Sequence, residues 1–191
     1  VNKSNVEIIT SKENECIKRL KKIQDKKYRD EFCSFLVEGV KIVEEIISSY
    51  PSKINLIIFS QQAIKKYHNL YKNALKLFRS GKIGQVILVS ERISEYISTT
   101  DTPQGVYAEV KFIHKKFDSL TNYDDIVVLD TIQDPGNLGT IIRSVDAFGF
   151  KNAVILEGSV DIYNPKVIRA SMGSLFHIDI FKDIDKYELV R

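Results

Sequence analysis

The sequence lacks the features that define several common protein classes. Only Cys16 and Cys33 are cysteines among 191 residues, which excludes a disulfide-rich scaffold and indicates thiols in a reducing compartment. No apolar run approaches the roughly 18 residues that a membrane span requires. The first 15 residues also lack the apolar stretch of a signal peptide. We therefore expect a soluble, cytoplasmic protein with no membrane partner.

Motifs for several common cofactors are missing as well. Neither GxGxxG nor GxxxxGK[ST] occurs, which argues against a dinucleotide site or a P-loop. The three histidines, His68, His114 and His177, lie far apart and lack the spacing of metal ligands. The sequence therefore predicts no metal site.

Charge is distributed unevenly along a chain that has enough apolar residues, 43%, to bury a core. Residues 1–117 contain 21 Lys and Arg against 13 Asp and Glu, a net charge of +8. Residues 118–191 contain 7 against 12, a net charge of −5. This asymmetry indicates two units with different tasks, one of which faces a polyanion, although uneven surface charge alone would also produce it.

Strand and helix patterns alternate along the first part of the chain, which predicts an α/β sandwich. Short β-branched or aromatic runs predict strands, and amphipathic stretches predict the helices between them. The predicted strands are 35–38, 54–59, 85–90 and 105–113, and the predicted helices are 12–29, 39–49, a stretch within 61–79, and 91–98.

A second α/β pattern begins after a polar segment. The apolar run 126–130 is typical of a strand buried on both faces of a parallel sheet. Helices at 138–148 and 164–172 and strands at 153–157 and 175–180 complete a βαβαβ unit, the opening half of a doubly wound fold, followed by a helix-like tail. We therefore predict a domain over 1–114, a linker over 115–125 and a second, partial domain over 126–191.

The segment 130–149 is the most informative part of the sequence. A buried strand ends at Asp130, the chain turns through a Pro-Gly pair, and Asn137 is placed to cap a new helix. Arg143 lies one and a half turns further on, and its side chain leans back toward the loop. Such a loop suits a phosphate or a sugar hydroxyl. The alternative is a well-capped turn in which Arg143 pairs with Asp146.

Two basic segments indicate contact with nucleic acid. Residues 18–29 carry seven cations and one acid, and we predict that Lys18, Lys22, Lys26 and Arg29 share one helical face. Residues 61–90 carry six cations and no acid, with four aromatic or histidine side chains between them. The alternative for both segments is a solvated helix face. The interleaved residues are Tyr67, His68, Tyr71 and Phe78.

The motif LDTIQDPGNLGTIIRSVDAFGF (129–150) resembles the first signature of the SpoU, or TrmH, branch of the SPOUT methyltransferases. NPKVIRASMGSLFHIDI (164–180) resembles the segment that follows it. In the first half, FLVEGVKIVEE (35–45) and TTDTPQGVYAEV (99–110) resemble the substrate-binding domain of that family, which is similar to the ribosomal protein L30e fold. The resemblance covers nearly the whole chain.

This resemblance implies a fold of an L30e-like sandwich followed by a partial SPOUT domain. It implies transfer of a methyl group from S-adenosylmethionine to a ribose 2′-hydroxyl of ribosomal or transfer RNA. It also implies that Asn137 and Arg143 belong to the active site and that Glu38 and Lys41 lie on the face toward RNA. An arginine is normally protonated, so we expect electrostatic positioning rather than a role as a base.

The chain departs from the family pattern after Ile180. The two later signatures, a Gly-x-Glu loop and a Ser-Leu-Asn segment, form the knot and hold the cofactor in that family, and neither follows. Cofactor-binding residues are therefore unknown. We expect a truncated or degenerate chain that is inactive by itself, and we do not predict that it forms the family's homodimer.

Two other functions remain open from the sequence. One is a non-enzymatic RNA-binding protein in which the second domain is vestigial. The other is a fragment of a nucleotide-binding oxidoreductase, which rests only on the βαβ pattern and lacks the glycine fingerprint.

Overall fold

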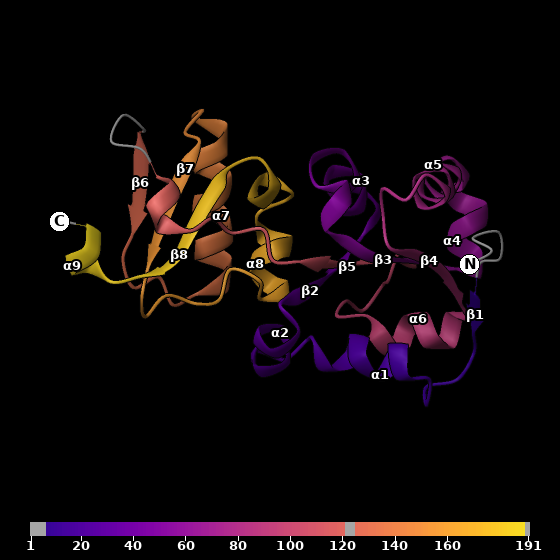
Figure 1. The fold of residues 1–191 in the computed structure, drawn as a ribbon. Coiled ribbons are helices and arrows are strands. Elements are labelled where there is room, and N and C mark those ends of the chain that lie inside the picture. The colour runs from indigo at the N-terminus through magenta and orange to yellow at the C-terminus, as the bar shows by residue number, and fades with distance from the viewer. Residues whose placement is uncertain (1–6, 121–124, 190–191) are drawn as a thin grey trace. The chain divides into compact units, whose positions relative to one another are not determined.

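The computed structural model describes residues 7–120 and 125–189. It divides the chain into two compact units, Val1–Phe112 and Ile113–Arg191 (Figure 1). Each unit has its own sheet, as the alternating sequence patterns predict. Both units are mixed α/β, so the predicted fold class is confirmed at that level.

The first unit is built on a five-stranded sheet with the order β1-β4-β3-β5-β2. The strands β1, β4 and β3 are parallel, and β5 runs antiparallel to both β3 and β2. The β-branched runs form the strands close to where the sequence predicts them. Their bounds are β1 Glu7–Ile9, β2 Ser34–Glu38, β3 Ile54–Ser60, β4 Gln85–Val89 and β5 Val106–Lys111.

Helices cover both faces of this sheet (Figure 1). One face carries α1 Glu15–Lys22, α2 Lys26–Phe32 and α6 Glu91–Ile97, and the other carries α3 Val40–Ser49, α4 Gln61–Lys66 and α5 His68–Arg79. A short 3-10 helix, η1 Pro51–Lys53, leads into β3. Apolar residues of α1 and α6 form one core with the strands, including Ile17, Leu20 and Ile93, all fully buried. Burial of these side chains holds the helices on the sheet.

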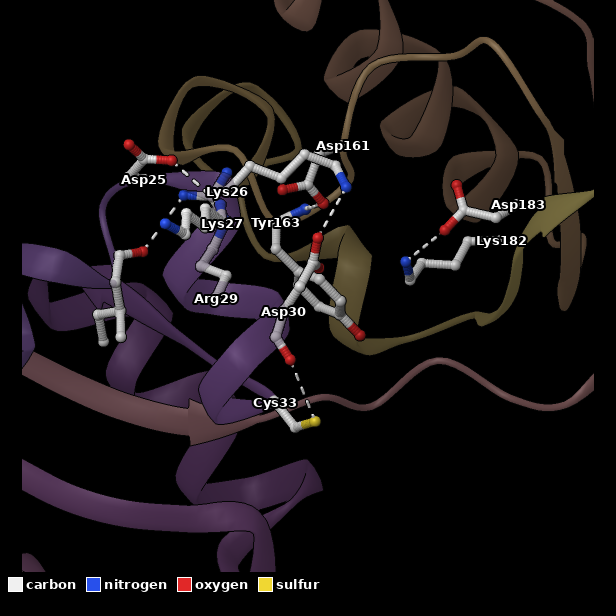
Figure 2. A network of polar contacts seen from close by, with 11 residues as sticks. Asp25, Lys26, Lys27, Arg29, Asp30, Cys33, Asp161, Tyr163, Lys182 and Asp183 are labelled. Carbon is white, nitrogen blue, oxygen red and sulfur yellow. Dashed lines mark hydrogen bonds and ion pairs between the residues drawn. The ribbon is translucent and has the colours of Figure 1, made fainter.

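The predicted single helix over 12–29 is wrong, because two helices meet there. The first ends at Lys22, and Asp25 starts the second by accepting a hydrogen bond from the backbone N–H of Lys27 at 3.0 Å (Figure 2). A side chain that satisfies a backbone donor in this way favours a new helix start over continuation. The cationic side chains before and after Asp25 therefore do not share one helical face.

The second unit contains a three-stranded parallel sheet with the order β6-β7-β8. Pro135 and Pro165 start two of the helices at the first turn, where the missing N–H has no intrahelical partner. The elements are η2 Phe117–Ser119, β6 Ile126–Leu129, α7 Pro135–Ala147, β7 Asn152–Leu156, α8 Pro165–Ala170, η3 Ser174–Phe176, β8 Asp179–Ile184 and α9 Lys186–Leu189.

The prediction of a strand over 175–180 is wrong at its start. Residues 174–176 form the 3-10 helix η3, and the strand begins at Asp179 and continues to Ile184. The apolar run that suggested a strand is instead packed as a buried turn, with Leu175 and Phe176 almost fully enclosed. A short apolar run cannot by its period distinguish these two conformations.

Part of the segment predicted as a linker, 115–125, packs within the second unit. Lys115 forms an isolated bridge with Phe181, and the ring of Phe117 lies edge-on to the ring of Phe181 at 6.4 Å between centroids. Residues 121–124 of this segment lie outside the described residues. No helix within the described parts of the chain is long and apolar enough to cross a membrane.

Candidate functional site

The loop after β6 is tied to the loop after β7 at the carboxyl ends of the parallel strands. The backbone N–H of Ile132 donates to the Ser159 hydroxyl at 3.2 Å, and the N–H of Val160 donates to the carbonyl of Ile132 at 2.8 Å. Thr131 has a left-handed backbone, with φ of +53°, and its hydroxyl donates to Asp130 at 2.6 Å. A β-branched residue in this conformation is strained, and such strain concentrates at functional sites.

A cavity of about 410 Å³ lies beside this loop. Its volume is within the range of small-molecule sites. All of its lining residues come from one segment, the loop and the first turns of α7, so they form one wall and not a complete enclosure. They are Thr131, Ile132, Gln133, Asp134, Asn137, Thr140 and Ile141.

Asn137 does not cap α7, which corrects the sequence prediction. Asp134 is the capping residue, and its carboxylate accepts a hydrogen bond from the backbone N–H of Asn137 at 2.7 Å. Proline at the first helical position identifies the residue before it as the cap, so the sequence carried this signal. Because its side chain is not used for capping, Asn137 is exposed and lines the cavity with its amide.

Arg143 is exposed on α7 but is not among the residues that line the cavity. It follows Asn137 by six residues, which places it about 9 Å further along the helix axis. The alternative partner for Arg143, Asp146, accepts instead a hydrogen bond from His177 at 2.8 Å. Burial alone would raise the pKa of Asp146, but hydrogen bonds from His177 and Ser174 outweigh it and lower that pKa.

Gly139 allows two helices of the second unit to pack closely. A Cβ atom at this position would lie 2.5 Å from the Cβ of Ala170 and 2.7 Å from the carbonyl oxygen of Val167. No side chain fits there, so the glycine lets α8 approach α7 closely. The helix that carries Asn137 and Arg143 is thereby held in place.

The cations predicted on α1 and α2 are found in different surroundings. Lys18 forms ion pairs with Glu13 and Glu15, at 3.0 and 3.4 Å, and the hydrogen bonds that its ammonium donates to these carboxylates raise its pKa. Lys26 forms an ion pair with Asp30 at 2.8 Å (Figure 2). Each of these lysines therefore has an acid beside it.

The other two predicted cations of this segment also differ from each other. Arg29 is 3% exposed, and its guanidinium donates to the backbone carbonyls of Ile23 and Gln24, at 3.2 and 2.6 Å. It holds the turn between α1 and α2 together and does not lie on the surface. Lys22 is exposed, with its ammonium 5.6 Å from the centroid of the Tyr28 ring.

Glu38 and Lys41 lie at the carboxyl end of β2 and the start of α3. The Glu38 carboxylate accepts hydrogen bonds from the hydroxyls of Ser98, Thr99 and Thr100 and from the backbone N–H of Thr99, at 2.7 to 3.0 Å. The sequence did not reveal this function of Glu38, which is to hold the loop after α6. Lys41 is exposed.

Within the parts of the chain that the structure describes, no group of three or more His, Cys, Asp or Glu side chains is arranged to hold a metal ion. The site on the second unit is a cavity wall that carries the carboxylate of Asp134 and the amides of Gln133 and Asn137, and Arg143 lies further along the same helix.

The two units of the chain match two known domain families. Residues 14–108 match the MRM3-like substrate binding domain, and residues 124–190 match the SpoU rRNA Methylase family. The SpoU rRNA Methylase match over 124–190 is the family that the 129–150 motif resembles, so this prediction is confirmed for the second unit.

Related proteins match along most of this chain. The Bacillus subtilis 23S rRNA (guanosine(2553)-2′-O)-methyltransferase RlmP is 33% identical over 175 residues, which cover 91% of this chain and 64% of the relative. The Xenopus laevis mitochondrial rRNA methyltransferase 3 is 29% identical over 180 residues, which cover 88% of this chain and 40% of the relative. The chain thus spans less than two thirds of the length of these curated relatives.

A solved structure has the same fold. The AdoMet-bound rRNA methyltransferase from Sinorhizobium meliloti superimposes with a TM-score of 0.83 at 28% identity, over 97% of this chain and 67% of that one. This likeness agrees with the expected combination of an L30e-like and a SPOUT unit at the level of fold class.

Proposed function

We propose that this chain is part of an RNA methyltransferase that transfers a methyl group from S-adenosylmethionine to a ribose 2′-hydroxyl of ribosomal RNA. The observation that carries the proposal is the match over 91% of the chain to a relative named as a 23S rRNA 2′-O-methyltransferase. The organised loop between β6 and α7, which carries the family motif, supports it.

Asn137 and Arg143 are the proposed active-site residues. Asn137 lines the cavity, where its amide can donate to and accept from a ribose or an amide group. Arg143 is exposed on the same helix, and long helical side chains lean toward the helix start. Its guanidinium would orient the attacking hydroxyl and a neighbouring phosphate by electrostatic attraction, because arginine stays protonated in proteins.

S-adenosylmethionine would supply the methyl group and the positive sulfonium that makes it transferable. The described residues form only one wall of a pocket, and no lysine or arginine lines that wall to pair with the carboxylate of such a molecule. We therefore assign no residue of this chain to the cofactor.

The first unit is the proposed RNA-binding part, with Lys22 and Lys41 exposed and available for phosphates. Lys18 and Lys26 would have to exchange their carboxylate partners for phosphates, and Glu38 acts through the loop that it holds. A cytoplasmic location stays a prediction of the sequence, which fractionation tests. Sedimentation equilibrium tests whether this chain forms the homodimer that the family resemblance implies.

The test is transfer of tritiated methyl groups to ribosomal RNA by the complete reading frame that encodes this chain. Removing one positioning group from an electrostatically organised site costs about 10²–10³ in rate, which we expect for Asn137→Ala and Arg143→Gln. Arg92→Gln, an exposed arginine of α6, is the charge-matched control and should leave the rate unchanged.

Two results would oppose the proposal. Full activity of Arg143→Gln would remove that residue from the site. RNA binding without methyl transfer would favour the non-enzymatic alternative. Residues 1–191 alone, assayed in parallel, test the sequence prediction that they are inactive.

A further inference from the structure

The segment that contains α4 and α5 carries unbalanced positive charge. Between residues 61 and 90 there are six cations and no acid. All six side chains are exposed: Lys65, Lys66, Lys72, Lys76, Arg79 and Lys82. This segment differs from α1 and α2, where Lys18 and Lys26 each lie beside a carboxylate. Six like charges repel one another, and a bound anion would reduce this repulsion, so the segment is suited to bind an anionic partner.

Three of these cations form a line on the outer face of α5. Lys72, Lys76 and Arg79 are spaced by four and three residues, so they are neighbours on one side of the helix. The rise between them is about 6 Å and about 4.5 Å. We call these three residues the α5 basic strip. The repeating phosphates of a nucleic acid backbone present charge in a similar linear series.

A second observation at the end of α5 points the same way. A cavity of about 360 Å³ lies between the start of β3, the loop after α5 and the end of β5. Lys82 and Lys111 line it, together with Ser52 and Asn55, and no acid is among its lining residues. A Cβ atom at Gly84 would collide with the carbonyl oxygen of Asn55, so the glycine permits this close arrangement of loop and strand.

Glu91 and Glu109, the acids nearest in sequence to this segment and to Lys111, already have partners. Glu91 accepts a hydrogen bond from the backbone N–H of Gln62 at 2.8 Å. Glu109, which precedes Lys111, is 4% exposed and forms an ion pair with Arg19 at 2.6 Å. Glu44 is exposed on α3, which covers the same face of the sheet. The strip and the cavity therefore keep a net positive charge.

The aromatic side chains of this segment limit what kind of contact is possible. The ring of Tyr71 lies edge-on to the buried ring of Phe59 at 5.3 Å, and Phe78 is half-buried. Base recognition in single-stranded RNA generally uses exposed aromatic faces for stacking. The Tyr71 ring is thus engaged with the core, and the six exposed cations are the groups of this segment that suit contacts to phosphates.

We propose that the α5 basic strip, together with Lys82 and Lys111, binds the phosphate backbone of RNA. The α5 basic strip lies on the face of the first sheet opposite α1 and α2, so it is distinct from the cations that the sequence singled out there (Figure 1). Lys111 differs, because it also lines a cavity together with Glu15 and Arg19 of α1. The inference rests on the proposed function only in taking RNA as the partner.

An anionic membrane surface is the other polyanion that such a helix could meet. A helix that lies on a membrane buries its apolar face among lipids. The apolar face of α5 is already used, because Leu70 and Ala74 are buried in the core of the first unit. The structure therefore favours RNA.

The test measures binding of the 191-residue chain to a blunt RNA duplex without loops, by fluorescence anisotropy at several salt concentrations. The variant Lys72→Gln/Lys76→Gln/Arg79→Gln should lower the affinity at about 0.1 M salt by tenfold to a hundredfold and reduce the slope of log K against log salt by about 2. Lys72→Arg/Lys76→Arg keeps the charge and should retain the slope. Lys82→Gln/Lys111→Gln tests the cavity in the same way.

The charge-matched control is Lys115→Gln/Lys151→Gln/Lys186→Gln, which removes three cations from the second unit. It should leave the slope within about half a unit of the parent value if the strip is the contact. Circular dichroism confirms that each variant is folded.

Five outcomes distinguish the inference from the proposed function. Loss of slope in the strip variant alone supports the inference. Equal loss in the strip and control variants shows a general charge effect and overturns it. Binding of anionic vesicles but not of the duplex would also overturn it. Absence of any RNA binding by the parent chain would overturn the RNA-binding role itself, whereas unchanged binding by the strip variant would remove only this surface.

Discussion

The role of Glu38 can be tested by a single substitution. Its carboxylate accepts four hydrogen bonds from Ser98, Thr99 and Thr100. In Glu38→Gln one carboxylate oxygen becomes an NH₂ group, which cannot accept. If this NH₂ group takes the place of Oε2, it faces the backbone N–H of Thr99, which donates to Oε2 at 2.9 Å in the parent chain. If it takes the place of Oε1, the hydroxyls of Ser98 and Thr100 lose their acceptor.

The magnitude follows from the bonds that are lost. Hydrogen bonds to a charged group contribute about 1.5–3 kcal/mol each, and neutral ones about 1 kcal/mol. In Glu38→Gln the remaining amide oxygen still accepts hydrogen bonds, but these bonds are weaker because the negative charge is lost. At least one donor of the loop loses its acceptor. Because Glu38 is only half-buried, water can replace part of the lost bonds. We therefore expect a loss of about 2 kcal/mol in the free energy of unfolding for Glu38→Gln and a larger loss for Glu38→Ala, which loses all four bonds.

The assay is urea unfolding of the 191-residue chain, followed by hydrogen exchange of residues 98–105 to locate the effect. Glu44→Gln, which removes an exposed carboxylate of α3, is the matched control and should change stability by less than about 0.5 kcal/mol. Exchange in the loop should accelerate in Glu38→Gln because the loop opens more readily.

The opposite result is informative. If Glu38→Gln unfolds at the same urea concentration as the parent chain but binds RNA more weakly, the carboxylate contacts RNA directly. The sequence-based assignment would then be correct, and the loop-holding role inferred from the hydrogen bonds would be refuted.

Three further predictions concern packing and pH. Gly139→Ala should destabilise the second unit by about 1–3 kcal/mol in thermal unfolding, because its methyl group would overlap Ala170; an unchanged Tm would disprove the close approach. Burial raises the pKa of Tyr107 to about 12, above its unfolded value of 10.0. The stability that its neutral phenol contributes is therefore complete below pH 10 and is lost as the pH rises toward 12. In denaturation experiments at alkaline pH, Tyr107→Phe should flatten this dependence of stability on pH. The pKa of Asp146 is lowered, so its ionised carboxylate stabilises the fold above pH 3.8, and this stabilisation is lost as the pH falls below that value. Asp146→Asn should therefore be less stable than the parent chain at neutral pH and equally stable in acid. Equal stability at neutral pH would show that the hydrogen bond from His177 to Asp146 contributes nothing.

Several elements of the fold could be predicted because the signals are local. The β-branched run at 54–59 forms a strand that is buried along almost all of its length, as expected. The apolar run at 126–130 also forms a strand, but the predicted burial on both faces is wrong, because β6 is an edge strand on which Val128 is 39% exposed. Asp25 was overlooked within an apparently continuous helix over 12–29. One carboxylate that bonds to a backbone N–H two residues later was enough to end one helix and start another.

For the candidate site, the sequence identified residues, and the structure was needed for their positions. Asn137 and Arg143 were found through the motif, but their geometry was not. Asp134 caps the helix, Asn137 lines the cavity, and Arg143 lies about 9 Å further along the helix axis and outside the lining.

The sequence by itself determined the family, the α/β class and the motif around Asn137, because these depend on residue identity and on periods read along the chain. The tertiary structure alone decided which charges are available. It buried Arg29 against backbone carbonyls, tied Glu38 to a loop some 60 residues away, and left the three cations of the α5 basic strip exposed. Ion pairing and burial depend on groups distant in sequence that folding brings within a few ångströms, and a linear pattern does not contain that information.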